Sequence, residues 1–326
     1  MAKKRPFNKV EEQLLLMPTW WLITIVSILL AGFALLVEPE PIGKNPLKVL
    51  FDNAESIAIA SAVILYFKEI PERKKQRHYE AWQIIDNAHG IKTSYARRKA
   101  IEDLYEDGIS FREIDIPEAD LQGINLKGAD LSRADLSGAN LREVKLTNTI
   151  LKGIKLSHAN LSHVHFGALT DLSNVDFEYA KLPHANLGMV KLSHADLSHA
   201  DLSHADIKWT KLDNAFLNYA NFSRACLVRT DLTHAKLSNA NLSEADLSNA
   251  FLRGAILGGT NFDETNLCET DLSYANLCGA NLSTALLGDT NLHAIEWNER
   301  TQWPAPQKVA MAKNIPEELK RQLGIE

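Results

Sequence analysis

The sequence is short of several features that mark secreted proteins, enzymes and nucleic-acid-binding proteins. Its three cysteines, Cys226, Cys268 and Cys278, are an odd number without a CxxC spacing, so a reducing compartment is favoured over disulfides or a zinc knuckle. No Ser/His/Asp set, glycine-rich phosphate loop or HExxH motif is present. The net charge of −6 gives no basic footprint for nucleic acid. We therefore expect no enzyme, no cofactor and no nucleic-acid partner.

Long apolar runs are confined to the N-terminal third. Residues 19–37 (TWWLITIVSILLAGFALLV) carry no charge and are long enough to cross a bilayer as a helix. A second run, 49–67, is interrupted near its start by Asp52 and Glu55. The two runs predict a transmembrane helical hairpin over 19–67. A cleaved signal peptide is the alternative for the first run, but its length and the second run behind it favour an uncleaved span.

Asp52 and Glu55 lie three residues apart and would share one face of a helix. Because both acids fall at one end of the second run, they are expected at the outer interface, in water or headgroups. The alternative is an acidic pair inside the membrane that recognises a partner helix. Both residues are therefore candidates for contact with a membrane partner.

Lysines and arginines predict the orientation of the hairpin. Residues 1–18 contain four of them, and a basic cluster at 68–77 follows the second run. By the positive-inside rule, both termini lie on the cytoplasmic side. Residues 68–108 then read as a helical linker and N-terminal cap, in which Gly90 and Gly108 end two helices.

A five-residue rule holds from residue 109 to 297. The central apolar residue recurs at 111, 116 and on to 166, then, after one extra residue in FGALTDL, at 172, 177 and on to 297. The position two before each centre is mostly alanine, and the position between them is mostly aspartate or asparagine. A period of five forms no apolar face on a helix or a strand. If the chain turns a corner once per repeat, four repeats close a square coil that buries both apolar positions.

The predicted fold is therefore an all-β solenoid over 109–297, preceded by the hairpin and the capping helices. About nine and a half coils at ~4.8 Å spacing give a rod roughly 45 Å long. Both ends of such a rod need caps. Residues 298–326, with a short helix near 316–323, are expected to close the second end.

These repeats resemble the pentapeptide-repeat family, whose motif is A(D/N)LXX. GADLSRADLSGANL (128–141) and NANLSEADLSNAFL (239–252) are close to it. The resemblance implies a right-handed quadrilateral β-helix and extends to membrane-anchored cyanobacterial members. Some members of the family bind DNA gyrase as duplex mimics, and most have no assigned activity.

The stretch LSHADLSHADLSHAD (192–206) looks like a metal or proton-transfer site, but its histidines fall on successive corners of the coil. Residues one coil apart are twenty apart in sequence, or twenty-one across the insertion, so His163, His184 and His204 are predicted to form one column. Such a column could hold a divalent metal. It lacks the enclosed ligand shell that a site needs, so we expect solvated histidines and no metal site.

Departures from the motif on the outside of the coil are candidates for contact with a partner. Met189 and Trp209 are predicted one coil apart on one face, and Tyr179 and Tyr219 on another. The full set of partner-binding candidates is Met189, Trp209, Phe216, Tyr179, Tyr219, Phe251 and Ile256. The alternatives are that the chain's own helices cover these side chains, or that scattered exposed apolar residues carry no meaning.

The expected function is that of a non-enzymatic scaffold or assembly factor, integral to a plasma or thylakoid membrane, with its rod in the cytosol. Its expected partner is a membrane complex or a cytosolic protein, and a homo-oligomer is possible. A gyrase-binding duplex mimic is the alternative, although residues 109–297 carry 15 basic residues against 23 acidic ones, whereas a duplex is uniformly negative. A ligand surface on the histidine column is the third hypothesis.

Overall fold

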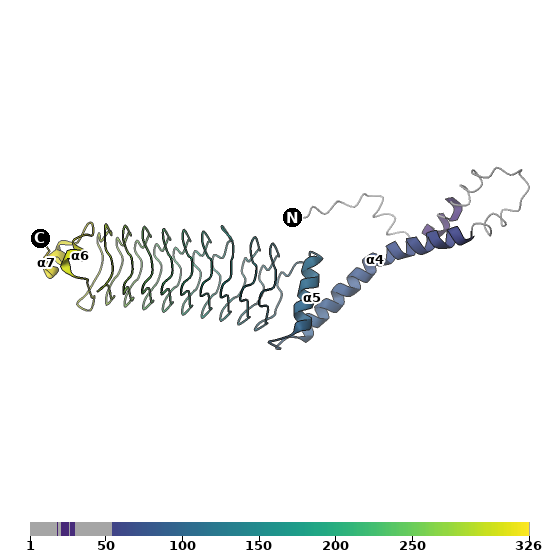
Figure 1. Ribbon diagram of the computed structural model, residues 1–326, viewed down its shortest axis with the longest axis horizontal. Coiled ribbons are helices and arrows are strands. Elements are labelled where there is room, and N and C mark those ends of the chain that lie inside the picture. The colour runs from purple at the N-terminus through teal and green to yellow at the C-terminus, as the bar shows by residue number, and fades with distance from the viewer. Residues whose placement is uncertain (1–17, 19–20, 26, 30–53, 326) are drawn as a thin grey trace, which may run out of the picture. The chain divides into compact units, whose positions relative to one another are not determined.

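A computed structural model describes residues 18, 21–25, 27–29 and 54–325 of the 326-residue chain (Figure 1). The chain divides into two units, residues 1–82 and 83–326, which are treated separately below. The helices are α4 (Ala54–Asn87), α5 (Tyr95–Glu106), α6 (Pro306–Val309) and α7 (Glu317–Leu323). Between α5 and α6 the chain forms a coil of short bridges and turns.

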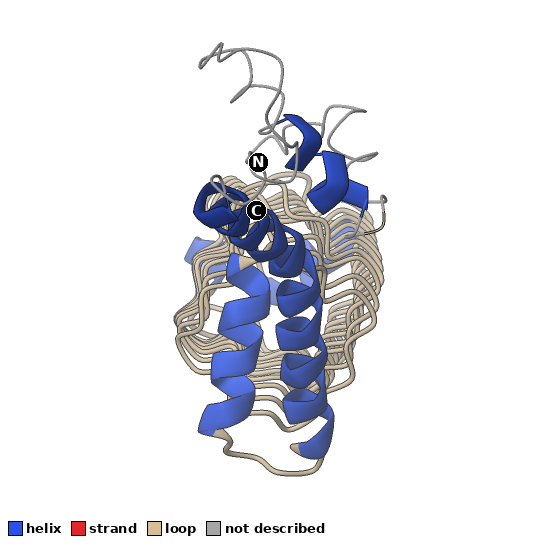
Figure 2. Cartoon of the chain, turned by 90° about the vertical axis from the view of Figure 1, so that its right-hand side faces the viewer, coloured by secondary structure: helices blue, strands red, loops and turns tan. Residues whose placement is uncertain are grey.

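The predicted quadrilateral β-helix is confirmed, and its bridges between coils begin at Asp115. One residue on each side of a coil, the one before the central apolar residue, pairs in parallel with its counterpart in the next coil, as Asp201 does with Asn221. Bridges therefore join residues twenty apart, and twenty-one apart across the insertion. Seen along the rod, successive coils repeat one outline (Figure 2). Parallel pairing of this kind satisfies the backbone groups that an isolated coil would leave open.

The backbone of one repeat shows why five residues make one side. The amides of Leu187 and Met189 donate to the carbonyls of Asp206 and Lys208 in the next coil, at 2.8 and 2.9 Å. The amide of Val190 donates back to the carbonyl of Leu187 at 3.1 Å and closes the corner. Met189, the second corner residue, has φ +61°. From Glu113 to Ala294 this left-handed corner recurs in almost every repeat, which the sequence did not predict.

The core of the rod is the column of central residues with the small residues two positions before them. Leu187, Leu202 and Leu242, for example, are 0–1% exposed, and Ala185, Ala200 and Ala240 are equally buried. At most positions where threonine replaces alanine, its hydroxyl donates to the carbonyl of a central residue in the previous coil, as from Thr260 to Leu237 at 2.8 Å. Six further threonines make the same bond: Thr149, Thr210, Thr230, Thr265, Thr270 and Thr290.

The ladder between coils is interrupted once within the described rod, beside the extra residue in FGALTDL. Ile150 pairs with Asp130 in the coil before, but has no bridge to the coil after it. Leu146, Asn148, Leu151 and Gly153 lack the backbone bonds to the next coil that equivalent residues make elsewhere along the rod. Figure 1 shows a wider interval between two coils in this part. One added corner residue thus opens one side of the sheet without changing which side chains face inward.

Helix α5 and the end of α4 close the first coil. Ile85, Ile101 and Leu104 are buried, and the amide of Asp120 donates to the carbonyl of Lys92 at 2.8 Å. Arg97 of α5 is wholly buried and donates to the carbonyls of Ala88, Ile91 and Lys92 at 2.7–2.8 Å. These carbonyls lie at and just beyond the C-terminal end of α4, where a cation is favourable. Burial lowers the pKa of Arg97, and the charge of Asp120 opposes that shift.

The C-terminal segment closes the other end. Gln302 and Lys313 continue the bridges of Asn281 and Asn291. Val309 of α6 and Leu319 of α7 are fully buried, and the indole Nε1 of Trp297 donates to Oε1 of Gln322 at 3.0 Å. The last coil therefore pairs with non-repeat chain in place of another coil.

The N-terminal third differs from the prediction. None of the helices in the described part of the chain is long and apolar enough to cross a membrane, so the structure does not support the predicted hairpin. Most of the first run, 19–37, and Asp52 lie outside the described residues; 21–25 and 27–29 are helical. The second run was expected to end at residue 67, before a separate helical linker over 68–108. Instead α4 continues through Pro71 to Asn87, so a large polar part belongs to the same helix.

Candidate interaction surface

The outer positions of the rod form columns in which each side chain lies against its counterparts in neighbouring coils. A polar example is the ladder Asp201, Asn221, Asn241, Asn261 and Asn281. Each asparagine Nδ2 donates to the Oδ1 of the previous member at 3.0–3.2 Å. The same Oδ1 atoms of Asn221 and Asn241 also accept the amide two residues on. These half-buried side chains are engaged with one another, which leaves little for a partner.

The predicted column of His163, His184 and His204 exists. Its imidazole rings stack with centroids 4.9 and 4.8 Å apart and with planes within 13° of parallel. The next members are Arg224 and Glu244, which form a double hydrogen bond at 2.8 and 2.9 Å. This bond holds the pKa of Glu244 below its usual value. The imidazoles face one another and do not converge on a point, and no group of three or more His, Cys, Asp or Glu in the described chain could hold a metal ion.

A second column, here called the aromatic corner, consists of His158, Tyr179, His199 and Tyr219. The rings stack in that order with centroids 4.9, 4.6 and 4.9 Å apart. The sequence placed the two tyrosines on one face but did not predict that histidines fill the stack between them. Tyr179 and Tyr219 are 44% and 56% exposed. Each ring covers the faces of its neighbours, so the corner offers ring edges to solvent.

A third column, the apolar corner, consists of Leu169, Met189 and Trp209. Their exposed fractions are 71%, 50% and 50%, and the guanidinium of Arg229 lies 4.6 Å from the Trp209 ring centroid. Leu169 was missed because it belongs to the insertion, where the count of five fails; continuing the column back across that extra residue would have found it. Three large apolar side chains in consecutive coils make a continuous exposed strip.

The other predicted residues do not join one surface. Phe216 and Ile256 lie on the same side of the rod, but Lys236 stands between them with its Nζ 4.4 Å from the Phe216 ring centroid. Phe251 lies on another side, between Asp231 and Asp271. Glu55 is exposed in the first turn of α4, and the structure shows no partner that would test its predicted role. The three cysteines are free.

The two corners lie diagonally across the rod. Trp209 and Tyr219 are two repeats apart, and each repeat advances one corner, so two of the four corners separate them. A small partner docked on one corner would leave the other uncovered. Of the two, the apolar corner has more of the character of a binding surface, since its three consecutive apolar side chains are 50–71% exposed. The rings of the aromatic corner stack on one another instead.

Comparisons with known proteins agree on the repeat. The family model described as pentapeptide repeats matches in eight copies, over residues 118–167 and 170–283. No curated protein matches the chain.

Among solved structures, HetL from the cyanobacterium Nostoc sp. strain PCC 7120 is 29% identical over 67% of this chain and 92% of its own, with a TM-score of 0.37. HetL is described as involved in heterocyst differentiation regulation. The fluoroquinolone resistance protein QnrB1 is 16% identical over 63% of this chain and 98% of its own, with a TM-score of 0.39. Rfr23 from the cyanobacterium Cyanothece 51142 is 26% identical over 53% and 92%, with a TM-score of 0.14. All three TM-scores are below 0.5, so the assignment to a family rests on the family-model match alone.

Proposed function

Because the chain belongs to the pentapeptide-repeat family, we propose that it is a non-enzymatic scaffold, attached to a membrane, that binds another protein on the wall of its rod. Family membership supports the scaffold class. The finer statement rests on the apolar corner, which is the single observation that carries it. Leu169, Met189 and Trp209 stand at positions that are otherwise mostly polar or glycine, and each of the three is 50% or more exposed.

The arrangement of polar side chains supports a binding role over a catalytic one. Inward positions hold alanine, leucine and hydrogen-bonded threonine. Outward polar groups recur at one coil spacing and bond along their columns, as the asparagine ladder does. Catalysis needs groups that converge on a reacting atom, whereas a flat wall with one apolar strip suits a protein surface.

Membrane attachment is supported by the sequence of residues 19–37, which has no charge over a bilayer-spanning length. The basic residues on either side of the apolar N-terminal runs support a cytoplasmic position for the rod, in a plasma or thylakoid membrane. The proposed partner is a protein of that membrane or of the cytosol, and a second copy of the chain is included among these partners.

A photo-crosslinking amino acid placed at Trp209 in the full chain, expressed in its own cells, tests the binding surface. The matched control is the same amino acid at Asn214, which is also exposed, also left-handed with φ 58°, and one corner away. We expect one defined crosslinked protein from position 209 and none from 214. Equal crosslinking at both positions, or none at either, would contradict the proposal.

The gyrase-binding alternative is disfavoured by the charge of the rod. Lysines such as Lys155, Lys191 and Lys211 occupy bridge positions among the aspartates, and one of them, Lys155, pairs with Asp135 at 3.0 Å. A duplex mimic needs a continuous negative surface. A supercoiling assay with gyrase and the purified full chain separates the two hypotheses: inhibition would favour the mimic over the scaffold.

A further inference from the structure

Helix α4 carries an exposed apolar stripe in the unit of residues 1–82. Ile59, Val63, Tyr66 and Ile70 follow one another at intervals of four, three and four residues, which places them on one face of a helix. Each is between 42% and 66% exposed. A stripe with this spacing is the usual docking face of an amphipathic helix, and here it belongs to a helix of 34 residues.

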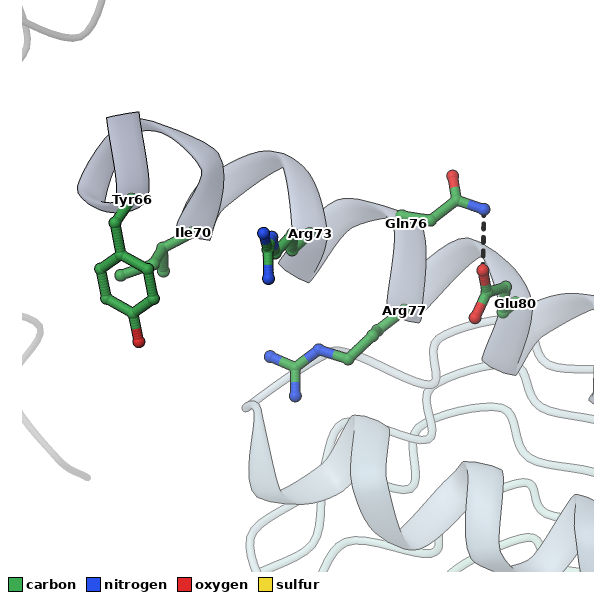
Figure 3. Close-up of a pocket in the computed structure, with 6 residues that line it drawn as sticks. All are labelled: Tyr66, Ile70, Arg73, Gln76, Arg77 and Glu80. Atoms are coloured by element: carbon green, nitrogen blue, oxygen red, sulfur yellow. Dashed lines mark hydrogen bonds between the residues drawn. The ribbon is translucent and has the colours of Figure 1, made fainter. Parts of the chain in front are cut away.

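The same face continues into two arginines. Arg73 and Arg77 follow Ile70 at intervals of three and four residues, and with Tyr66 they line a shallow hollow on α4. Figure 3 shows Tyr66, Ile70, Arg73 and Arg77 on one side of the helix, while Gln76 turns away to bond Glu80 at 2.9 Å. The stripe is therefore apolar in its first half and cationic in its second.

The charges around the stripe are unequal. Residues 66–80 hold five lysines and arginines against three glutamates, a net of +2 without His78. Arg73 pairs with Glu69 at 2.6 Å, but both side chains are more than half exposed. Exposed ion pairs contribute little free energy of stabilisation. A phosphate group can therefore compete for this arginine. Lys68 and Lys75 lie roughly on the opposite side of the helix.

An apolar strip that runs into cations is complementary to the surface of an anionic bilayer, where acyl chains lie beside phosphate groups. A crossing orientation fits poorly. If the helix left the bilayer upright at residue 67, Arg77 would stand about 15 Å beyond the apolar core, whereas the headgroup layer is roughly 6 Å thick. An axis that lies along the surface brings both arginines to the level of the phosphates.

We propose that α4 lies along an anionic lipid surface, with Ile59, Val63, Tyr66 and Ile70 in the acyl boundary and Arg73 and Arg77 on lipid phosphates. This inference rests on the proposed membrane attachment and specifies the lipid that the helix recognises. It replaces the second predicted span by an interfacial helix.

The test measures binding of the full chain to vesicles of phosphatidylcholine, with and without about a third of phosphatidylglycerol. The informative variant is Arg73→Gln with Arg77→Gln. The matched control is Lys68→Gln with Lys75→Gln, which removes the same two charges from the other side of α4. We expect wild type to prefer the anionic vesicles, and salt to reduce that preference. The arginine variant should lose roughly 10- to 30-fold in affinity for the anionic vesicles, and the lysine variant threefold or less.

Each other outcome is decisive. If the chain binds both vesicle types equally and alkali does not remove it, the protein is attached to membranes but α4 does not recognise anionic lipid. That result would overturn the proposed lipid site and support membrane attachment. Equal losses in the two double variants would show diffuse attraction and also overturn the site. Binding to neither vesicle would overturn membrane attachment itself. Preference retained in the arginine variant but lost in Ile70→Asp would overturn the role of the arginines.

Discussion

The rod and the N-terminal part of α4 treat similar apolar side chains in opposite ways. In the rod, leucines such as Leu202 are about 1% exposed, and the neighbouring Asp201 bridges residues twenty positions away in each direction. In α4, Ile59 and Ile70 are 66% and 42% exposed, and the described polar contacts are local, such as Arg73 with Glu69. Apolar content is therefore not what distinguishes the regions. The rod uses its apolar residues to hold itself together, while α4 leaves them available for another surface.

The largest expected effect comes from placing a charge at matched apolar positions in the two regions. Leu202→Asp buries an unpaired carboxylate in the column of the rod and should cost about 4 kcal/mol or more, enough to disrupt several coils. Ile70→Asp should leave thermal unfolding of the rod unchanged, because that side chain is already in solvent. Circular dichroism melting of both full-length variants checks this. Similar melting temperatures would contradict the view that the rod depends on its apolar side chains and α4 does not.

Arg97 is expected to be the most sensitive polar residue of the N-terminal cap. Arg97→Met removes three hydrogen bonds to buried or half-buried carbonyls and should destabilise the cap by about 3 kcal/mol. Hydrogen exchange should rise in α5 and the first coil and leave the later coils protected. Arg98→Met serves as the control, since Arg98 is partly exposed and makes one 3.4 Å contact with Glu102; its effect should be within about 0.5 kcal/mol.

Deleting Ala168 should repair the interrupted ladder. The shortened corner then follows the five-residue rule, and Leu146, Asn148, Leu151 and Gly153 regain partners in the next coil. Each regained bond should contribute about 0.5–1.5 kcal/mol. The deletion also removes the two bonds that Thr170 makes to the carbonyls of Phe166 and Gly167. We therefore expect the free energy of unfolding to rise by about 2 kcal/mol. Denaturant unfolding measures it. A marked loss of stability would show that the inserted corner is already optimal.

The buried threonines should each contribute about one hydrogen bond. Thr260→Val keeps the volume but removes the 2.8 Å bond to the carbonyl of Leu237, and should cost about 1 kcal/mol. Thr233→Val, at a partly exposed corner position with no described hydroxyl bond, should be nearly neutral. If the two variants unfold at the same denaturant concentration, the hydroxyl bonds do not help to hold the coils together.

The smallest expected effect is a loss of stability in acid. Hydrogen bonds from Ser132 lower the pKa of Asp130, and hydrogen bonds from Ser173 lower that of Asp171, below the ordinary 3.8. Because these pKa values are depressed in the folded chain, their stabilisation is present above the unfolded value and lost as the pH falls through the folded one. Asp130→Asn with Asp171→Asn keeps the Oδ1 acceptors and cannot titrate. Its melting temperature should fall less than that of wild type between about pH 6 and pH 3.

The interior of the rod could be predicted because it depends on repetition alone. Counting by five identified nearly all of the inward residues, although Trp297, counted as the last centre, is only half-buried. Counting by twenty placed Met189 beside Trp209, and counting by twenty-one across the insertion placed His163 beside His184. Features that depend on backbone conformation escaped this count. The left-handed corners, the hydroxyl bonds of the threonines and the open ladder beside residue 168 leave no pattern of polarity in the sequence.

Features outside the repeat could not be predicted from the sequence either. Arg97 reads as one more charge on a polar helix, yet it is buried against the end of another helix. The second apolar run predicts a span although Asp52 and Glu55 leave only its last twelve residues uncharged. The structure shows that those residues continue into a charged helix, so a window of hydropathy could not reveal where the element ends. Leu169 joined the apolar corner only after the insertion was taken into account.

The left-handed corner has a consequence for how this protein can change over evolutionary time. Histidine, tryptophan, tyrosine, arginine and glycine all occupy it here at φ values near +60°, so its conformation is imposed by the coils above and below and does not depend on the side chain. Replacing one corner residue by another leaves the leucine column untouched. Such a chain can acquire or lose a binding partner through a few substitutions in one column, while its architecture is inherited unaltered.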